Sequence, residues 1–67
     1  MRILLIEDDL ELANGLRRAF AQAGHACDHL AEGRGAAAAV AITGYDALVL
    51  DLGLPDIDGL DLLAQLR

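Results

Sequence analysis

Short apolar runs that end at acidic residues alternate with longer segments of helical spacing along this chain. The first run consists of Ile and Leu and stops at Glu7, and a later apolar run stops at Asp51. An apolar run of four or five residues with polar neighbours is typical of a strand buried in a parallel sheet. We therefore predict strands over 1–6 and 45–50, each meeting solvent at an acidic residue.

Helical spacing appears after the first strand. Leu12, Leu16 and Phe20 recur every four residues, and Ala13 and Ala23 widen this apolar stripe. Such a stripe predicts an amphipathic helix packed on the sheet. The remaining predicted elements share the same alternation of strand and helix. In chain order the pattern predicts a helix from Asp8 or Asp9 to Ala23 stopped by Gly24, an edge strand over 25–30, an Ala-rich helix over 36–42, a loop over 52–57, and a helix from Gly59 to the last residue capped by Asp58.

The order of the strands decides whether the acidic residues meet. If the second strand lies on one side of the first and the third on the other, right-handed crossovers place the first two helices on opposite faces. The first strand is then the switch point, and a crevice opens between the carboxyl ends of strands one and three. Glu7, Asp8 and Asp51 would share that crevice. Strands arranged in sequence order would instead separate Asp51 from the other two.

Three carboxylates in one crevice favour a bound cation, because they repel one another and the nearby sequence has no basic residue to offset them. Oxygen ligands of this kind suit a hard divalent ion, and we expect Mg²⁺. Asp8 has a second possible role, since Asp8 and Glu11 have the spacing of a helix capping box. Asp9 is more consistent with a cap or a surface acid than with a ligand.

Composition narrows the classes of function. The chain has 67 residues and a formal net charge of −6, which argues against nucleic-acid or anionic-membrane binding by this segment. No apolar stretch is long enough to span a bilayer, and the start does not resemble a signal peptide. Cys27 is the only cysteine, so no internal disulfide is possible, and we expect it to be a small buried apolar residue. Low cysteine content fits a cytoplasmic location.

Three stretches carry a family resemblance: ILLIEDD at the start, the GH turn after the first helix, and YDALVLDLGLPDIDGLDLL at the end. Together they resemble the amino-terminal half of a response-regulator receiver domain of two-component signalling, in particular receivers joined to winged-helix DNA-binding domains. The resemblance covers the whole chain. It implies a flavodoxin-like (CheY-like) three-layer α/β/α fold, here the β-α-β-α-β-α half with parallel strand order 2-1-3. Residues 1–67 would then form a partial receiver domain that lacks its last two strands, with their switch hydroxyl and phosphate-binding lysine, and any DNA-binding domain.

The resemblance also implies roles for individual residues. Asp51 matches the aspartate that accepts a phosphoryl group from a sensor histidine kinase. Glu7 and Asp8 match the acids that bind Mg²⁺, with Asp51 and the backbone carbonyl of Gly53 as further ligands. The implied function is that of a cytoplasmic signalling module that controls transcription through a DNA-binding domain, and not that of a metabolic enzyme.

Two other functions remain open. Haloacid-dehalogenase-type phosphotransferases also use Asp at a strand end with Mg²⁺, but they expect a second Asp two residues later, where this chain has Gly53. The chain is alternatively an interaction fragment without phosphorylation. Whatever its function, this segment would expose its third strand as a sheet edge. We expect it to self-associate through that strand or to swap elements, or else to be the ordered part of a longer molecule.

The remaining residues of interest are interpreted as structural or solvated. We expect His25 and His29 on the edge strand, away from the crevice, and Pro55 as a residue that fixes loop geometry. The residues expected to be solvated charges are Asp56, Asp61, Arg17, Arg18 and Arg34.

Overall fold

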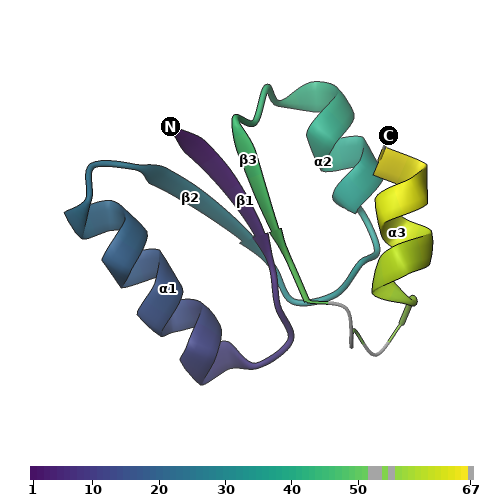
Figure 1. Ribbon diagram of the computed structural model, residues 1–67, viewed down its shortest axis with the longest axis horizontal. Helices are drawn as coiled ribbons and strands as arrows, with labels where there is room; N and C mark the ends of the chain where they lie inside the picture. Colours follow the sequence, from purple (N-terminus) through teal and green to yellow (C-terminus); the bar gives the residue numbers. More distant parts are fainter. Residues whose placement is uncertain (52–53, 55, 67) are drawn as a thin grey trace.

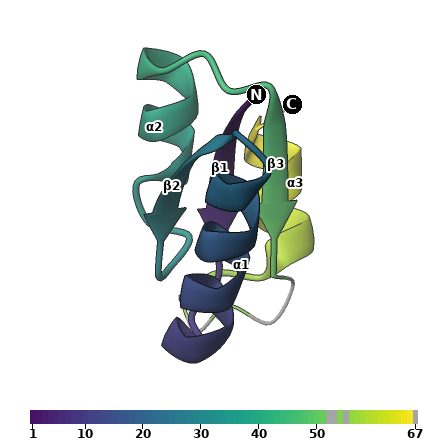
Figure 2. The ribbon, with the colours of Figure 1, turned by 90° about the vertical axis from the view of Figure 1, so that its left-hand side faces the viewer.

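A three-stranded parallel sheet lies between one helix on one face and two helices on the other, as Figures 1 and 2 show in a computed structural model. The structure describes residues 1–51, 54 and 56–66. Helix α1 covers one face, and α2 and α3 lie side by side on the opposite face. The elements are β1 (Arg2–Ile6), α1 (Leu10–Gln22), β2 (Ala26–Leu30), α2 (Ala36–Ile42), β3 (Ala47–Leu50) and α3 (Gly59–Leu66).

The sheet has the order β2-β1-β3, which confirms the predicted order 2-1-3. Strand β1 pairs in parallel with both neighbours, and Ile6 lies opposite Leu30 of β2 and Leu50 of β3. Residues 3–6 of β1 are buried, whereas the residues of β3 are only half-buried. The central strand therefore has the continuous apolar sequence expected of a strand covered on both faces.

The main core lies between the sheet and the pair α2 and α3. Leu4 and Ile6 of β1 pack there with Ala36, Leu54 and Leu62, all buried. Alternate residues of a strand point to opposite faces, so Ile3 and Leu5 face α1. Removing a leucine or isoleucine side chain from water is worth about 1.5–3 kcal/mol, so these few residues supply much of the favourable free energy of folding.

Helix α1 begins and ends with recognisable caps. The Asp9 side chain accepts a hydrogen bond from Leu12 N at 3.1 Å, which makes Asp9 the N-cap. At the other end Gly24 has φ +88°, and His25 N donates to Phe20 O at 2.9 Å. Gly24 N also donates to Ala21 O, which completes a Schellman motif. The predicted glycine stop is thus confirmed, and Asp9 rather than Asp8 is the cap.

The apolar stripe of α1 is narrower than predicted. Ala13 is fully buried and Leu16 and Phe20 are half-buried, so these residues face the sheet. Leu12 is 49% exposed, and Ala23 is also exposed, so the prediction that they belong to the buried stripe is wrong. With 3.6 residues per turn, a strict four-residue repeat drifts around the helix, and its first member leaves the contact face.

Strand β3 begins at Ala47, so the predicted start at Tyr45 is two residues too early. The Tyr45 hydroxyl donates to Asp28 Oδ2 at 2.6 Å, and the Arg2 guanidinium donates to the same oxygen at 3.0 Å. Arg2 Cζ also lies 5.8 Å from the centre of the Tyr45 ring. These contacts join β1, β2 and the segment before β3. They also lower the pKa of Asp28, the Tyr45 hydrogen bond being the largest cause and the Arg2 hydrogen bond the next.

The predicted loop and last helix are described in part. Asp58 Oδ1 accepts a hydrogen bond from Leu60 N at 2.8 Å, which confirms the predicted cap of α3. The expectation for Pro55 lies outside the described residues. Within the described part of the chain, no helix has the length and apolar character needed to cross a membrane.

Candidate metal centre

The acidic residues meet because the strand ladder continues one step beyond the strands. Glu7 N donates to Leu30 O at 3.0 Å, and Asp51 N donates to Ile6 O at 2.9 Å. These two hydrogen bonds hold the first residue after β1 and the first residue after β3 in register. Both residues therefore leave the sheet at the same edge, as the parallel arrangement requires.

Glu7, Asp8 and Asp51 each bring one carboxylate oxygen to within 4.8 Å of the others. Glu7 and Asp51 are half-buried, and Asp8 is exposed. Opposite ligands of an octahedral Mg²⁺ ion lie about 4 Å apart, so small side-chain rotations would let this group of oxygens fit such an ion. We name this group the acidic cluster. The structure thus brings together the three side chains that the sequence places together, while the binding of a metal ion stays a prediction.

The Glu7 carboxyl has a pKa above its ordinary value, first because of burial and then because of its acidic neighbours. Burial raises the pKa of the Glu7 carboxyl, and the neighbouring charges of Asp51 and Asp8 raise it further. The hydrogen bond from Asp9 N to Glu7 Oε1, at 3.1 Å, acts in the opposite direction. A divalent cation among these carboxylates would replace mutual repulsion by attraction, which is the electrostatic argument for a metal ion here.

Of the predictions for Asp9 and Gly53, the structure tests only the first. Asp9 caps α1 through its side chain and is not part of the acidic cluster, as expected from the sequence. The predicted carbonyl ligand of Gly53 lies outside the described residues.

His29 lies closer to the acidic cluster than predicted. Its Nε2 donates to the backbone oxygen of Glu7 at 2.8 Å, so the half-buried imidazole supports the segment that leaves β1. The interpretation of His29 as an edge residue is right, because β2 is an edge strand, but its placement away from the crevice is wrong. The parallel register gave a usable signal, since His29 lies opposite Leu5, two residues before Glu7.

Asp56 is exposed, as predicted, but it is not simply solvated. Its Oδ1 accepts a hydrogen bond from Gly33 N and its Oδ2 accepts one from Arg34 N, both at 2.8 Å. These hydrogen bonds lower the pKa of the Asp56 carboxyl, with Gly33 the largest cause. Spacing along the chain gives no sign of this contact, because the partners are more than twenty residues apart.

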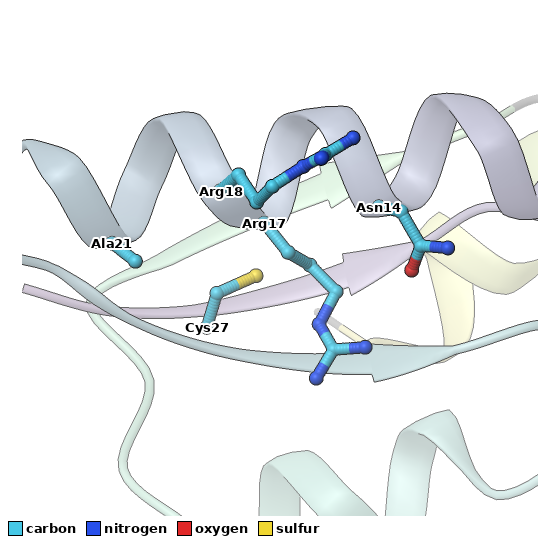
Figure 3. A pocket seen from close by; sticks show the side chains of 5 residues that line it. All are labelled: Asn14, Arg17, Arg18, Ala21 and Cys27. Carbon is cyan, nitrogen blue, oxygen red and sulfur yellow. The ribbon is translucent and has the colours of Figure 1, made fainter.

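A separate hollow lies between α1 and β2, away from the acidic cluster. It has a volume of about 510 Å³, and Figure 3 shows the Cys27 thiol pointing toward α1 within it. Burial raises the pKa of this thiol, and Cys27 is half-buried rather than buried. None of the predicted site residues lines the hollow, which is formed by Asn14, Arg17, Arg18, Ala21 and Cys27.

Fold and site together define a class: a parallel α/β domain with an acidic cluster at the carboxyl ends of its strands. Comparison with known proteins agrees. Residues 3–67 match the response regulator receiver domain. The chain therefore belongs to the response regulator receiver domain family.

Relatives of known name lie in the same family. Over all 67 residues the chain is 49% identical to the transcriptional regulatory protein QseB of Haemophilus influenzae, of which it covers 30%. A CheY-like receiver domain from Methylobacillus flagellatus is 36% identical with a TM-score of 0.93, covering 100% of this chain and 57% of that one. The regulator TrrA of Thermotoga maritima, solved in complex with Mg²⁺-BeF, is 27% identical with a TM-score of 0.91, covering 98% and 57%. The chain thus spans less than a third of the length of QseB.

Proposed function

We propose that this chain is the phospho-accepting part of a two-component response regulator, with Asp51 as the acceptor and Mg²⁺ held by Glu7, Asp8 and Asp51. The observation that carries the proposal is the convergence of these three carboxylates to within 4.8 Å at the carboxyl edge of the sheet. The Mg²⁺-BeF complex of the related Thermotoga regulator supports it, because that protein binds Mg²⁺ and has the same fold.

The chemistry assigned to Asp51 is a phosphoryl transfer. A carboxylate oxygen of Asp51 attacks phosphorus in line, a P–O bond to Asp51 forms, and the P–N bond to the donor histidine breaks. The leaving imidazole nitrogen takes up a proton. Bound Mg²⁺ supplies positive charge for the oxygens of the transferring group.

Asp51 is half-buried and lies next to Glu7, and its neighbours would position it and hold the cation. The strand-end hydrogen bond from Asp51 N to Ile6 O fixes its backbone, so the nucleophile is positioned before the donor arrives. Glu7 and Asp8 would hold the cation together with Asp51 and offset its charge. We also include the Gly53 carbonyl as a further ligand, by analogy with the family motif.

The proposed partner is a sensor histidine kinase that supplies the phosphoryl group. The relative QseB is a transcriptional regulatory protein more than three times as long as this chain. Control of transcription would require a DNA-binding domain beyond these 67 residues, and it is part of the proposal for that reason. The sequence position of Gly53, two residues after Asp51, argues against a haloacid-dehalogenase-type phosphotransferase.

Acetyl phosphate provides a direct test, because it is a small donor that needs no kinase. With Mg²⁺ present, the chain should gain the mass of one phosphoryl group, and chelation of Mg²⁺ should abolish the gain. Asp51→Asn should lose it, while Asp61→Asn, which changes an exposed acid in the first turn of α3, should keep it. Absence of the mass gain in a folded sample would favour an interaction fragment without phosphorylation.

A further inference from the structure

Two chain connections that are far apart in sequence are fastened together by one carboxylate. Asp56 lies in the connection from β3 to α3, and its two oxygens accept hydrogen bonds from the consecutive backbone N–H groups of Gly33 and Arg34 at 2.8 Å each. Gly33 and Arg34 lie in the connection from β2 to α2. We name this pair of hydrogen bonds the Asp56 clasp. Hydrogen bonds that involve a charged acceptor are about twice as strong as neutral ones.

Packing beside the Asp56 clasp brings Gly33 close to Ile57 and Leu62. Gly33 is buried, and a Cβ added to it would lie 2.1 Å from Ile57 Cγ2 and 3.2 Å from Leu62 Cδ2. The backbone of Gly33 therefore approaches Ile57 as closely as only glycine allows. Ile57 in turn packs against the core on the α2 and α3 face. Hydrogen bonds to Asp56 and packing against Ile57 thus hold Gly33 at the same place.

The β3–α3 connection is also the segment that follows Asp51. It is fixed at its start by the hydrogen bond from Asp51 N to Ile6 O, in its middle by the buried Leu54, and at its far end by the Asp56 clasp. Asp51, Leu54 and Asp56 are therefore each held by a separate contact along one connection. A chain segment that loses one of its anchors has more conformations available, so loss of the Asp56 clasp would loosen the constraint on Asp51.

We propose that Asp56 is a positioning residue for the acidic cluster: through the Asp56 clasp it fixes the connection that carries Asp51, and it thereby strengthens divalent-cation binding at Glu7, Asp8 and Asp51. The effect on cation binding rests on the proposed function, whereas the effect on Asp51 does not. Asp56 itself is not part of the acidic cluster, and both its oxygens are engaged by backbone N–H groups.

The test compares Asp56→Asn with Glu32→Gln by NMR and by Mg²⁺ titration of the 67-residue chain. Glu32 is an exposed acid next to Gly33, so its variant removes the same charge without removing the clasp. Asn has only one acceptor oxygen, so exchange of the Gly33 and Arg34 amides should accelerate about tenfold. The Mg²⁺ dissociation constant should rise about three- to tenfold. Residues that support a metal ligand directly usually cost about 10- to 100-fold in affinity, and Asp56 acts at a greater distance. Glu32→Gln should change neither quantity by as much.

The possible outcomes separate the formation of the Asp56 clasp, its effect on Asp51 and the binding of Mg²⁺. Unchanged exchange at Gly33 and Arg34 would show that the Asp56 clasp is not formed in solution. The NMR spectra also give the chemical shift of the Asp51 carboxyl carbon, which reports its surroundings. If amide exchange becomes faster while this shift and the Mg²⁺ affinity both stay unchanged, Asp56 is purely structural and the proposal is overturned. If the unaltered chain binds no Mg²⁺, the proposed function fails, and the Asp51 carbon shift in metal-free protein still decides whether Asp56 positions Asp51.

A measurement on the unaltered chain covers the case in which Asp56→Asn does not fold. Coupling between two sites is reciprocal, so Mg²⁺ must slow the exchange of the Gly33 and Arg34 amides if the Asp56 clasp strengthens Mg²⁺ binding. Protection that rises about threefold or more on saturation with Mg²⁺ supports the proposal. Exchange that is the same with and without bound Mg²⁺ overturns it.

Discussion

At the scale of single residues, Gly33 and Gly15 place opposite demands on an added methyl group. At Gly33 the methyl would overlap Ile57. At Gly15, within α1, no described atom beyond its chain neighbours and the nearby backbone of its own helix lies within 4 Å of the position of a Cβ. The first glycine is required by close packing of two connections. The second is a helical residue whose only effect is its own conformational freedom.

Alanine at these two positions should therefore shift stability in opposite directions. We expect Gly33→Ala to lower the free energy of unfolding by about 1–3 kcal/mol, the usual cost of overfilling a packed site. Gly15→Ala should raise it by up to about 1 kcal/mol, because alanine is the better helix former. Urea unfolding followed by circular dichroism measures both. Stabilisation by Gly33→Ala would show that the connections are not packed as described.

Asp28 provides a prediction about pH. Its carboxyl accepts hydrogen bonds from Tyr45 and Arg2, so its pKa in the folded chain lies below the ordinary value of 3.8. A lowered pKa contributes stability that is present above 3.8 and is lost as the pH falls through the folded value. Tyr45→Phe should thus destabilise the chain near neutral pH, and the difference should shrink as the pH falls below 3.8. Unfolding curves at several pH values test this, and a constant difference down to strongly acidic pH would contradict it.

Among single residues, the sequence predicts the acids of the cluster but not their supporters. Glu7 and Asp51 could be found because each directly follows a recognisable apolar run, and Asp8 because it comes directly after Glu7. His29 and Asp56 could not, since each acts on backbone groups of a distant segment, and such contacts depend on the tertiary arrangement rather than on spacing. The metal-binding role of the cluster stays a prediction.

At the scale of elements, the start of α1 separates two roles that the sequence leaves mixed. Asp8 and Asp9 are neighbours, and both are possible caps by residue type. The structure gives the cap to Asp9, whose side chain accepts from Leu12 N, and leaves Asp8 in the acidic cluster. Adjacent acids of the same type thus belong to different structures.

Alanine variants of this pair should show opposite effects. Asp9→Ala should lower the free energy of unfolding by about 1 kcal/mol through loss of the cap, and should leave Mg²⁺ affinity nearly unchanged. Asp8→Ala should weaken Mg²⁺ binding without lowering stability, because it removes a negative charge from a repulsive cluster. Thermal unfolding and Mg²⁺ titration of both variants test this. If both variants lose Mg²⁺ affinity equally, the assignment of the cap and the ligand is wrong.

The bounds of the elements are predicted well for α2 and less well for β3. The helix over 36–42 is found as predicted, because its alanines follow glycine and stop before Thr43-Gly44. The third strand is predicted two residues too long, because nothing in the sequence shows that Tyr45 donates to Asp28. Leu12 is exposed for a similar reason, since the face that a helix buries depends on what packs beside it.

At the scale of the whole molecule, the sheet has one covered centre and two edges. Strand β1 is buried, while β3 pairs with β1 only, among the described residues, and is half-buried. An edge of apolar residues with free backbone groups is a template for pairing with another chain. Connectivity and the acidic strand ends leave two strand orders open, and the order β2-β1-β3 was predictable through the family resemblance.

The 67-residue chain should therefore self-associate through β3. Sedimentation velocity should show an average mass that rises with concentration. Val49→Lys places a charge on the pairing strand and should shift the chain toward monomer. Ala37→Lys adds the same charge on the exposed surface of α2 and serves as the control. A chain that stays monomeric at high concentration, and is folded, would contradict the prediction.

We expect Glu7, Asp8 and Asp51 to bind one divalent cation together. Mn²⁺ is a suitable probe, because it accepts the same oxygen ligands as Mg²⁺ and broadens the NMR signals of nearby nuclei. Substoichiometric Mn²⁺ should first broaden the amide signals of these three residues, and excess Mg²⁺ should restore them. Equal broadening at exposed acids elsewhere, such as Asp61, or no effect at Asp51, would contradict the account.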